Sequence, residues 1–120
     1  MRTPIKAQSE KRIFPRMTCA LPLALVSENA EVLRAESCDL SLAGVGIETF
    51  SGREVEVGEE LSVLVLGRRS VSAEVCWKRA GRLGLRFLGN IGEIATSWVG
   101  DFLADQRVMF REILPGETGN

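Results

Sequence analysis

The sequence predicts a mainly β protein, with about six short antiparallel strands in a small barrel or sandwich, followed by one amphipathic helix. Three observations support this fold class. Short runs of apolar residues, separated by glycine-marked turns, fill the chain up to Gly89. Apolar residues then recur with helical spacing after Gly89. The chain has 120 residues, of which 45% are hydrophobic, which suffices for one domain with a real core.

Three extended segments form the first half of the predicted sheet. The segment CALPLALV, residues 19–26, is apolar on both faces and reads as a strand. The segment AEVLRAESCDLS, residues 30–41, is a second strand that ends in polar residues. In LAGVGIETF, residues 42–50, Gly44 and Gly46 lie between apolar residues. Glycines within a strand pattern indicate a bulge, a sharp bend or the close approach of another group.

Three more segments complete the predicted sheet. The segment GEELSVLVLG, residues 58–67, reads as a strand with a glycine at each end, and a turn follows it. A second turn follows the next strand. The segment VSAEVCW, residues 71–77, alternates between apolar and polar residues, so we expect Trp77 in the core, although its ring could also be a stacking surface. The segment LGLRFL, residues 83–88, places Arg86 opposite its apolar face, as an outer-face residue or a cation at the rim.

The helix is predicted to begin at Asn90, because Asn90 with Glu93 three residues later has the spacing of a capping box. Apolar residues from Ile91 onward recur at the helical period, which favours packing of this helix on the sheet or across one end of it. We therefore expect a flexible tail at 1–8, one domain at 9–110 (a basic arm at 9–17, strands at 18–89, a helix at 90–110) and a flexible tail at 111–120.

Composition excludes several function classes. No apolar run reaches the roughly 18–20 residues of a membrane span, and the first residues lack the apolar core of a signal peptide, so we expect a cytoplasmic protein. The cysteines, Cys19, Cys38 and Cys76, form no CxxC pair and the chain has no histidine, which favours buried reduced thiols over a metal site. Without histidine, a P-loop, a nucleophile elbow or a dinucleotide fingerprint, we predict no enzymatic activity.

Charge is distributed unevenly along the chain. Residues 1–18 hold five cations and one carboxylate, a net charge of +4, and because the whole chain carries −1, the remainder carries −5. A basic arm on an acidic body indicates an anionic partner for the arm, although a solvated tail has the same composition.

Two short motifs carry the candidate chemistry. The arm contains Arg12 and Arg16 in the pattern R-x-x-x-R, and the strand-to-strand segment contains Asp39, Ser41 and Gly44 in the pattern D-x-S-x-x-G. Each motif alone has a simpler reading, because cations four residues apart arise by chance and because Asp, Ser and a Gly with positive φ are common in turns.

Taken together and in this order, with LGLRFLG before the helix, the motifs resemble the PilZ domain family of bacterial cyclic di-GMP receptors over residues 9–105. The resemblance implies a six-stranded antiparallel PilZ-type β-barrel with a C-terminal α-helix. It also implies that Arg12 and Arg16 contact cyclic di-GMP from the arm and that Asp39, Ser41 and Gly44 contact it from the barrel. Lys11 lies outside the motif and is either an added cation near the phosphates or a solvated lysine.

The residue types suit this ligand chemically. The planar fork of arginine meets phosphate oxygens or guanine O6 and N7, and its face can stack on a purine. A carboxylate such as Asp39 accepts from guanine N1–H and N2–H, Ser41 can donate to a phosphate or to N7, and Gly44 lets the backbone approach closely.

The family implies an adaptor that couples the nucleotide level to an unidentified effector protein, with motility, adhesion or exopolysaccharide production as output. The alternative is a PilZ-fold interaction adaptor that does not bind the nucleotide. A nucleic-acid polymer is not expected as partner, because exposed aromatic residues on a basic groove are lacking. No cofactor besides the ligand is expected.

Overall fold

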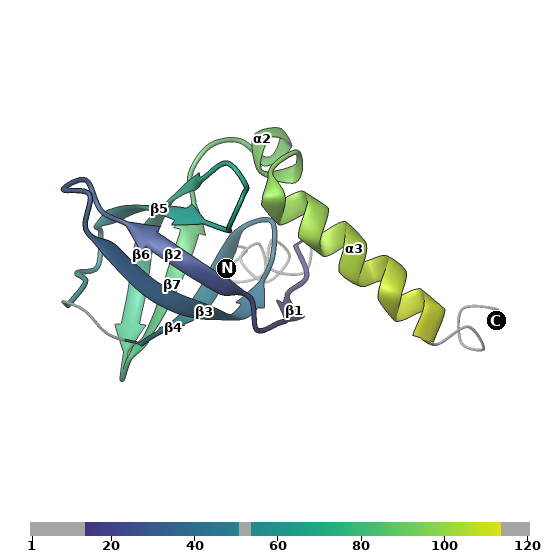
Figure 1. Cartoon of the computed structure of the whole chain (residues 1–120), viewed down its shortest axis with the longest axis horizontal. Coiled ribbons are helices and arrows are strands. Elements are labelled where there is room, and N and C mark those ends of the chain that lie inside the picture. The colour runs from purple at the N-terminus through teal and green to yellow at the C-terminus, as the bar shows by residue number, and fades with distance from the viewer. Residues whose placement is uncertain (1–13, 51–53, 114–120) are drawn as a thin grey trace, which may run out of the picture.

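The computed structural model of the chain describes residues 14–50 and 54–113, with the surroundings of side chains given up to residue 105 (Figure 1). The predicted tail at 1–8 and the first part of the basic arm, including Lys11 and Arg12, lie outside the described residues. None of the described helices combines the length and the apolar character that a membrane-spanning segment requires.

Six antiparallel strands form a closed barrel, as expected from the resemblance. Around the barrel the order is β3, β2, β5, β6, β7 and β4, and pairing of β4 with β3 closes the ring. A short seventh strand, β1 (Met17–Thr18), pairs with β3 beside the ring (Figure 1). The barrel strands are β2 (Pro22–Val26), β3 (Val32–Leu40), β4 (Gly44–Thr49), β5 (Glu60–Leu64), β6 (Val71–Arg79) and β7 (Arg82–Phe87).

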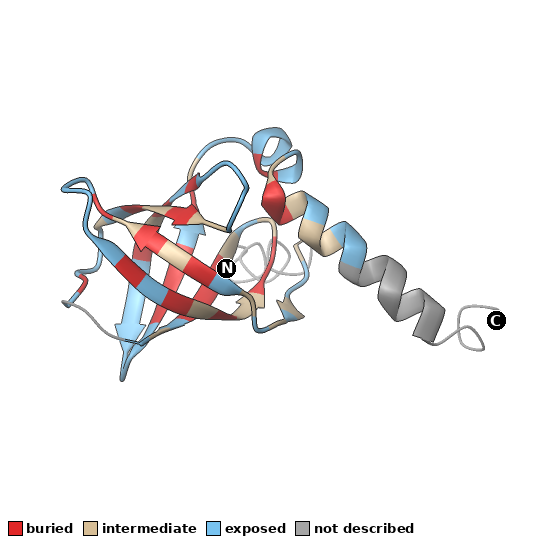
Figure 2. Cartoon of the chain, in the orientation of Figure 1, coloured by how far each residue is buried: buried red, intermediate tan, exposed pale blue. Residues whose placement is uncertain are grey.

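Alternation of side chains fills the barrel interior with apolar residues. Every second residue of each barrel strand turns inward, so the ribbons in Figure 2 change between buried and exposed along their length. Leu25, Val63 and Val75 are almost inaccessible to solvent and mark the centre of this core. Burial of such side chains stabilises the fold by about 1.5–3 kcal/mol each.

Two one-residue bulges interrupt this alternation, and they position the functional surface. In β3 the register shifts between Ser37 and Asp39, and in β6 it shifts between Val75 and Trp77. Each bulge reverses which face the following residues occupy. Ser37 and Val75 are therefore buried, whereas Asp39 and Trp77 lie on the outer face.

The expectation that Trp77 packs in the core is therefore wrong, since 44% of this residue is exposed. The strict alternation read from the sequence holds only up to Val75, because Cys76 is the extra residue of the bulge. Cys76 is also exposed, against the expectation that all three cysteines are buried, while Cys19 and Cys38 are half-buried.

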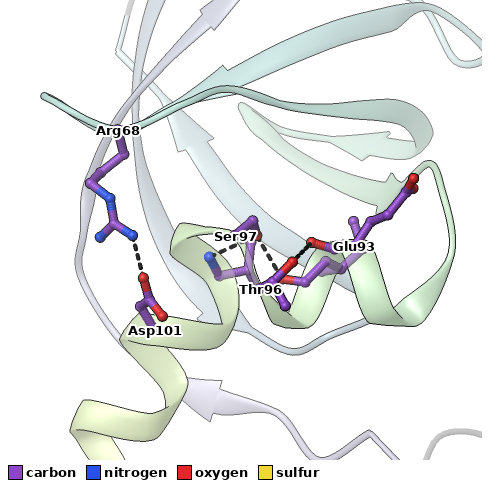
Figure 3. Close-up of polar contacts among 7 residues, drawn as sticks. Arg68, Glu93, Thr96, Ser97 and Asp101 are labelled. Carbon is purple, nitrogen blue, oxygen red and sulfur yellow. Dashed lines mark hydrogen bonds and ion pairs between the residues drawn. The ribbon is translucent and has the colours of Figure 1, made fainter.

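The helical segment begins where the sequence predicts, and Asn90 and Glu93 form the reciprocal capping box. It is not one continuous helix, however, because α2 (Ile91–Ala95) ends before α3 (Trp98–Ile113) begins. Between them, the hydroxyl of Ser97 accepts from the N–H of Val99 and donates to the carbonyl of Ile94 (Figure 3). Ser97 thus acts as an N-cap that starts a second helix.

Glycine makes this break possible. A Cβ on Gly100 would lie 1.8 Å from the carbonyl oxygen of Ala95, so only glycine allows the first turn of α3 to pass so close to the end of α2. The described start of α3 is held to the barrel by Trp98, which is buried and meets the ring of Phe87 edge to face at 6.3 Å. Arg68 also forms an ion pair with Asp101 at the surface (Figure 3).

Candidate functional site

Arg16, the described arginine of the R-x-x-x-R motif, is placed by the short strand that follows it. Met17 pairs with Leu40 and Thr18 pairs with Asp39, so the end of the arm runs along β3. The guanidinium of Arg16 lies 3.5 Å from a carboxylate oxygen of Asp39, with 66% of the Arg16 side chain exposed. An exposed pair at this distance contributes about 0.2–1 kcal/mol, so a ligand can separate it at little cost.

Buried Ser37 anchors the chain just after the arm. Its hydroxyl donates to the carbonyl oxygen of Cys19 at 2.8 Å and accepts from the N–H of Leu21 at 2.8 Å. The thiol of Cys19 also lies 3.2 Å from this hydroxyl, and burial raises the pKa of that thiol. The chain that follows Arg16 is therefore hydrogen-bonded to β3 two residues before Asp39. These bonds keep Arg16 and Asp39 near each other.

Ser41 organises the turn between β3 and β4. Its hydroxyl oxygen accepts from the N–H of Ala43 at 3.0 Å and from that of Gly44 at 3.3 Å, and its own N–H donates to the carbonyl of Gly44 at 2.9 Å. These contacts occupy the lone pairs of the hydroxyl and leave its hydrogen as a donor for a ligand acceptor. Ser41 therefore serves the turn whether or not it also contacts a ligand.

Gly44 does not supply a positive φ, which was one reading of its sequence position. A Cβ at Gly44 would lie 2.1 Å from the carbonyl oxygen of Leu85, so β4 and β7 can pair closely here only with glycine. The barrel itself thus requires glycine at this position, in addition to any need for ligand approach.

An open hollow of about 840 Å³ connects these elements, within the range of ligand pockets. Arg16 and Phe14 line it from the arm, Ser41 and Gly44 line it from the β3–β4 turn, and β6 and β7 complete it. Of the predicted site residues, the structure thus brings together Arg16, Asp39, Ser41 and Gly44, whereas Lys11 and Arg12 lie outside the described residues.

Trp77 and Arg86 also line this hollow, and neither was assigned to the site from the sequence. Arg86 proves to be an outer-face residue that pairs across the strands with Gly44 and with Glu74. Its guanidinium lies 2.5 Å from a carboxylate oxygen of Glu74, and this hydrogen bond raises the pKa of Arg86. Trp77 reaches the hollow because of the bulge at Cys76, and the alternation of residues in the sequence does not reveal this bulge.

The side chains in and beside the hollow are chemically suited to an anionic nucleotide. Two arginines, a carboxylate, a hydroxyl and an aromatic ring can meet phosphates, a base edge and a base face. Among the residues that the structure describes, no cluster of three or more histidine, cysteine, aspartate or glutamate side chains could hold a metal ion.

Comparisons with known proteins agree with the geometry. The family model described as PilZ domain matches residues 10–104. The fold is similar to that of the PilZ domain of CeSA from a cellulose-synthesizing bacterium, with TM-score 0.55 and 14% identity over 67% of this chain and 87% of that chain.

It is also similar to YcgR from Escherichia coli in complex with c-di-GMP, with TM-score 0.60 and 19% identity over 86% of this chain. The match covers 49% of the YcgR chain, so this chain corresponds to about half of it. A search of curated proteins gave no match.

Proposed function

The chain belongs to the PilZ domain family, and from this premise we propose that it is a cyclic di-GMP receptor that acts as an adaptor for an effector protein. The observation that supports the proposal most strongly is the gathering of Arg16, Ser41 and Gly44 at one hollow, with Asp39 in an ion pair with Arg16. YcgR, a protein of similar fold, has been solved in complex with c-di-GMP. We propose that the protein binds the nucleotide without catalysing a reaction on it. We also propose that it does so in the cytoplasm.

The ligand is a dianion with two guanine bases, and each part has a matching group. The guanidinium of Arg16 binds a phosphate or the O6/N7 edge of a guanine, because its fork donates bidentately to either. The carboxylate of Asp39 accepts from N1–H and N2–H of a guanine. The hydroxyl hydrogen of Ser41, whose oxygen is already engaged in the turn, donates to a phosphate or to N7.

In this proposal the ligand competes with the ion pair between Arg16 and Asp39. The ligand replaces one contact by two, since its guanine edge takes the carboxylate while its phosphate takes the guanidinium. The two charges are thereby re-paired with better hydrogen-bond geometry than the present 3.5 Å separation allows. Binding should therefore separate the pair and hold the arm in a new position.

We propose that Arg12 joins Arg16 on the ligand and that this ordering of the arm creates the surface read by the effector. Lys11 would add a cation near the phosphates. Order–disorder switching of this kind requires only that the ligand prefer the ordered arm over the free one. The effector and the output, whether motility, adhesion or exopolysaccharide production, depend on a partner that this surface selects.

A thermal-shift experiment tests the proposal. A ligand present at about 100 times its Kd stabilises the folded state by about 2.7 kcal/mol, which for a domain of this size raises Tm by roughly 10 °C. Cyclic di-GMP should give this shift in the parent, and Arg16→Ala should abolish most of it. The matched control is Arg34→Ala, because Arg34 is an exposed arginine on β3 that does not line the hollow.

An unshifted Tm in the parent at millimolar cyclic di-GMP would overturn the proposal and leave the adaptor that does not bind the nucleotide. An equal shift in the parent and in Arg16→Ala would show that the nucleotide binds elsewhere.

A further inference from the structure

A second hollow lies at the end of the barrel where the helical segment starts, between the turn that joins β5 to β6 and the junction of α2 with α3 (Figure 3). Its volume is about 580 Å³, within the range of ligand pockets. We call it the α2–α3 hollow. Residues 68–72 line it from the strands, and Glu93, Ile94 and residues 96–98 line it from the helices. None of these residues lines the hollow beside Arg16, so the two hollows are separate features of the surface.

Trp98 brings an unpaired hydrogen-bond donor to this hollow. The residue lines the hollow although only 2% of it is exposed, and no acceptor within the part of the chain that the structure describes meets its Nε1–H. Buried donors in folded proteins nearly always have a partner. The ring of Phe87 meets the indole edge to face, but an aromatic face is a far weaker acceptor than an oxygen atom. The indole N–H is therefore available to an acceptor that the barrel does not supply.

Two arginines of the β5–β6 turn give the α2–α3 hollow positive charge. Arg69 is exposed and forms no ion pair with any of the residues that the structure describes. Arg68 pairs with Asp101 of α3, but both side chains are partly exposed, so a second carboxylate can compete for Arg68 at little cost (Figure 3). Glu93 is the one carboxylate among the lining residues, and its Oε1 accepts from the N–H of Asn90 in the capping box. The balance of charge at the hollow therefore favours an anionic group.

The start of α3 acts in the same direction. Ser97 caps this helix, and both Ser97 and Trp98 line the hollow. The N-terminus of a helix carries a partial positive charge, because the peptide dipoles along the helix are aligned. The helix terminus, the indole donor and the two guanidinium groups therefore all favour negative charge at the same place.

An apolar side chain lies beside these cations. The N–H of Arg68 donates to the carbonyl oxygen of Val65 at 2.9 Å, and Gly67 has a φ of +77°, which together are typical of a type II turn. Leu66 lies at the corner of this turn and is 99% exposed. A partner that contacts both parts of this surface must therefore combine negative charge with apolar side chains.

We propose that the α2–α3 hollow and Leu66 form a docking site for an acidic segment of the effector protein. A carboxylate of that segment accepts from the indole N–H of Trp98 and from the guanidinium of Arg69, since an ionised carboxylate takes several donors at once. A neighbouring apolar side chain of the segment packs on Leu66. Because Nε1 of Trp98 is shielded from solvent, binding also moves a side chain at the hollow. Arg68 gains that freedom when the incoming carboxylate replaces Asp101 as its partner.

This inference rests on the adaptor role proposed above, but it needs neither the arm nor the nucleotide. The groups that carry it belong to the β5–β6 turn and to the junction of α2 with α3. We therefore expect the acidic segment to dock both with and without cyclic di-GMP, and the surface that the ordered arm creates adds to this contact.

The experiment is a peptide titration followed by NMR of the indole N–H signals of ¹⁵N-labelled protein. The parent has two tryptophans, so the signal that remains in Trp77→Phe belongs to Trp98. The probe is a blocked hexapeptide of alternating leucine and aspartate, and the control probe has asparagine in place of aspartate. The aspartate peptide should shift the Trp98 indole proton downfield in a saturable manner, because a hydrogen bond to oxygen deshields it. The asparagine peptide should bind more weakly, since hydrogen bonds to an ionised acceptor are about twice as strong as neutral ones.

Variants at exposed positions test the cations without disturbing the core. A double variant with Arg68→Ala and Arg69→Ala should bind the aspartate peptide about tenfold or more weakly than the parent. Asp101→Asn should raise the affinity, because it removes the carboxylate that competes for Arg68. Arg82→Ala is the matched control and should keep the parental affinity, because Arg82 is an exposed arginine of β7 that does not line this hollow.

Three results would each overturn the docking site. They are an unmoved Trp98 indole signal at millimolar aspartate peptide, equal affinity for the two peptides, and parental affinity in the double arginine variant. The titration contains no cyclic di-GMP, so any of these results leaves the receptor proposal intact. Conversely, a failure of cyclic di-GMP to bind overturns the receptor proposal and leaves this docking site standing.

Discussion

Two glycines of β4, two residues apart and on the same side of the strand, should differ in how much stability the same substitution costs. In Gly44→Ala the new Cβ would lie 2.1 Å from a backbone carbonyl oxygen of β7, whereas in Gly46→Ala it would lie 3.2 Å from the Asp39 carboxylate. A contact between carbon and oxygen normally needs about 3.3 Å. The first substitution must therefore move a strand by about 1 Å, and the second need only shift a side chain.

The expected cost of Gly44→Ala follows from the contacts that this movement breaks. The hydrogen bonds from Ser41 N–H to the Gly44 carbonyl and from Phe87 N–H to the Ala43 carbonyl lie at the same end of β4. Losing both costs about 1–3 kcal/mol, in the range found for overpacked sites. We therefore expect the free energy of unfolding to fall by about 1–3 kcal/mol, which lowers Tm by roughly 4–12 °C.

Gly46→Ala should leave stability within about 1 kcal/mol of the parent, because the tighter contact is offset by the reduced freedom of the unfolded chain. It should nevertheless weaken cyclic di-GMP binding, since it moves the Asp39 carboxylate. Urea and thermal denaturation followed by circular dichroism measure the stabilities of both variants, and calorimetry measures the binding of Gly46→Ala. A Tm for Gly44→Ala within 2 °C of the parent would refute the reasoning from the β4–β7 approach.

Other parts of the site and the fold lead to further predictions. Asp39→Ala should reduce the preference for cyclic di-GMP over cyclic di-AMP by about 1–3 kcal/mol, measured by calorimetry with both nucleotides, because adenine lacks the donors that the carboxylate accepts. The raised thiol pKa of Cys19 favours the folded state only while the unfolded thiol is protonated, so unfolding in urea should become easier as pH rises above 9.0, and less so in Cys19→Ala. Asp101→Asn should change the free energy of unfolding by less than about 1 kcal/mol because its ion pair is exposed, whereas Trp98→Ala should cost about 3–5 kcal/mol because Trp98 is buried.

The sequence predicted the strands well because they depend on local signals, whereas the closed barrel was expected from the family resemblance. Alternating residues and glycine-marked turns indicated the strands, and the Asn90–Glu93 spacing indicated the start of the helical segment. The break between α2 and α3 was not predicted, because nothing in the sequence marks Ser97 as an N-cap. The break becomes clear only from the contact of Gly100 with Ala95 in the structure.

The candidate site was predictable only in part. The motif residues Arg16, Ser41 and Gly44 do meet at one hollow, and Asp39 forms an ion pair with Arg16. Trp77 was assigned to the core because strict alternation was assumed along the whole strand. The bulge that reverses this alternation depends on the pairing of two strands, so the sequence of one strand does not reveal it. The partnership of Trp77 with Gly84, like that of Asp39 with Gly46, is likewise a property of strand register.

Isothermal titration of the parent with cyclic di-GMP tests the central claim most directly, with cyclic di-AMP as the control ligand that keeps both phosphates. We predict saturable binding of cyclic di-GMP at roughly tens of micromolar protein or below, much weaker binding of cyclic di-AMP, and severe loss of affinity in Arg12→Ala and Arg16→Ala. Absence of binding heat for cyclic di-GMP in a folded parent at several temperatures, or parental affinity in both arginine variants, would contradict it.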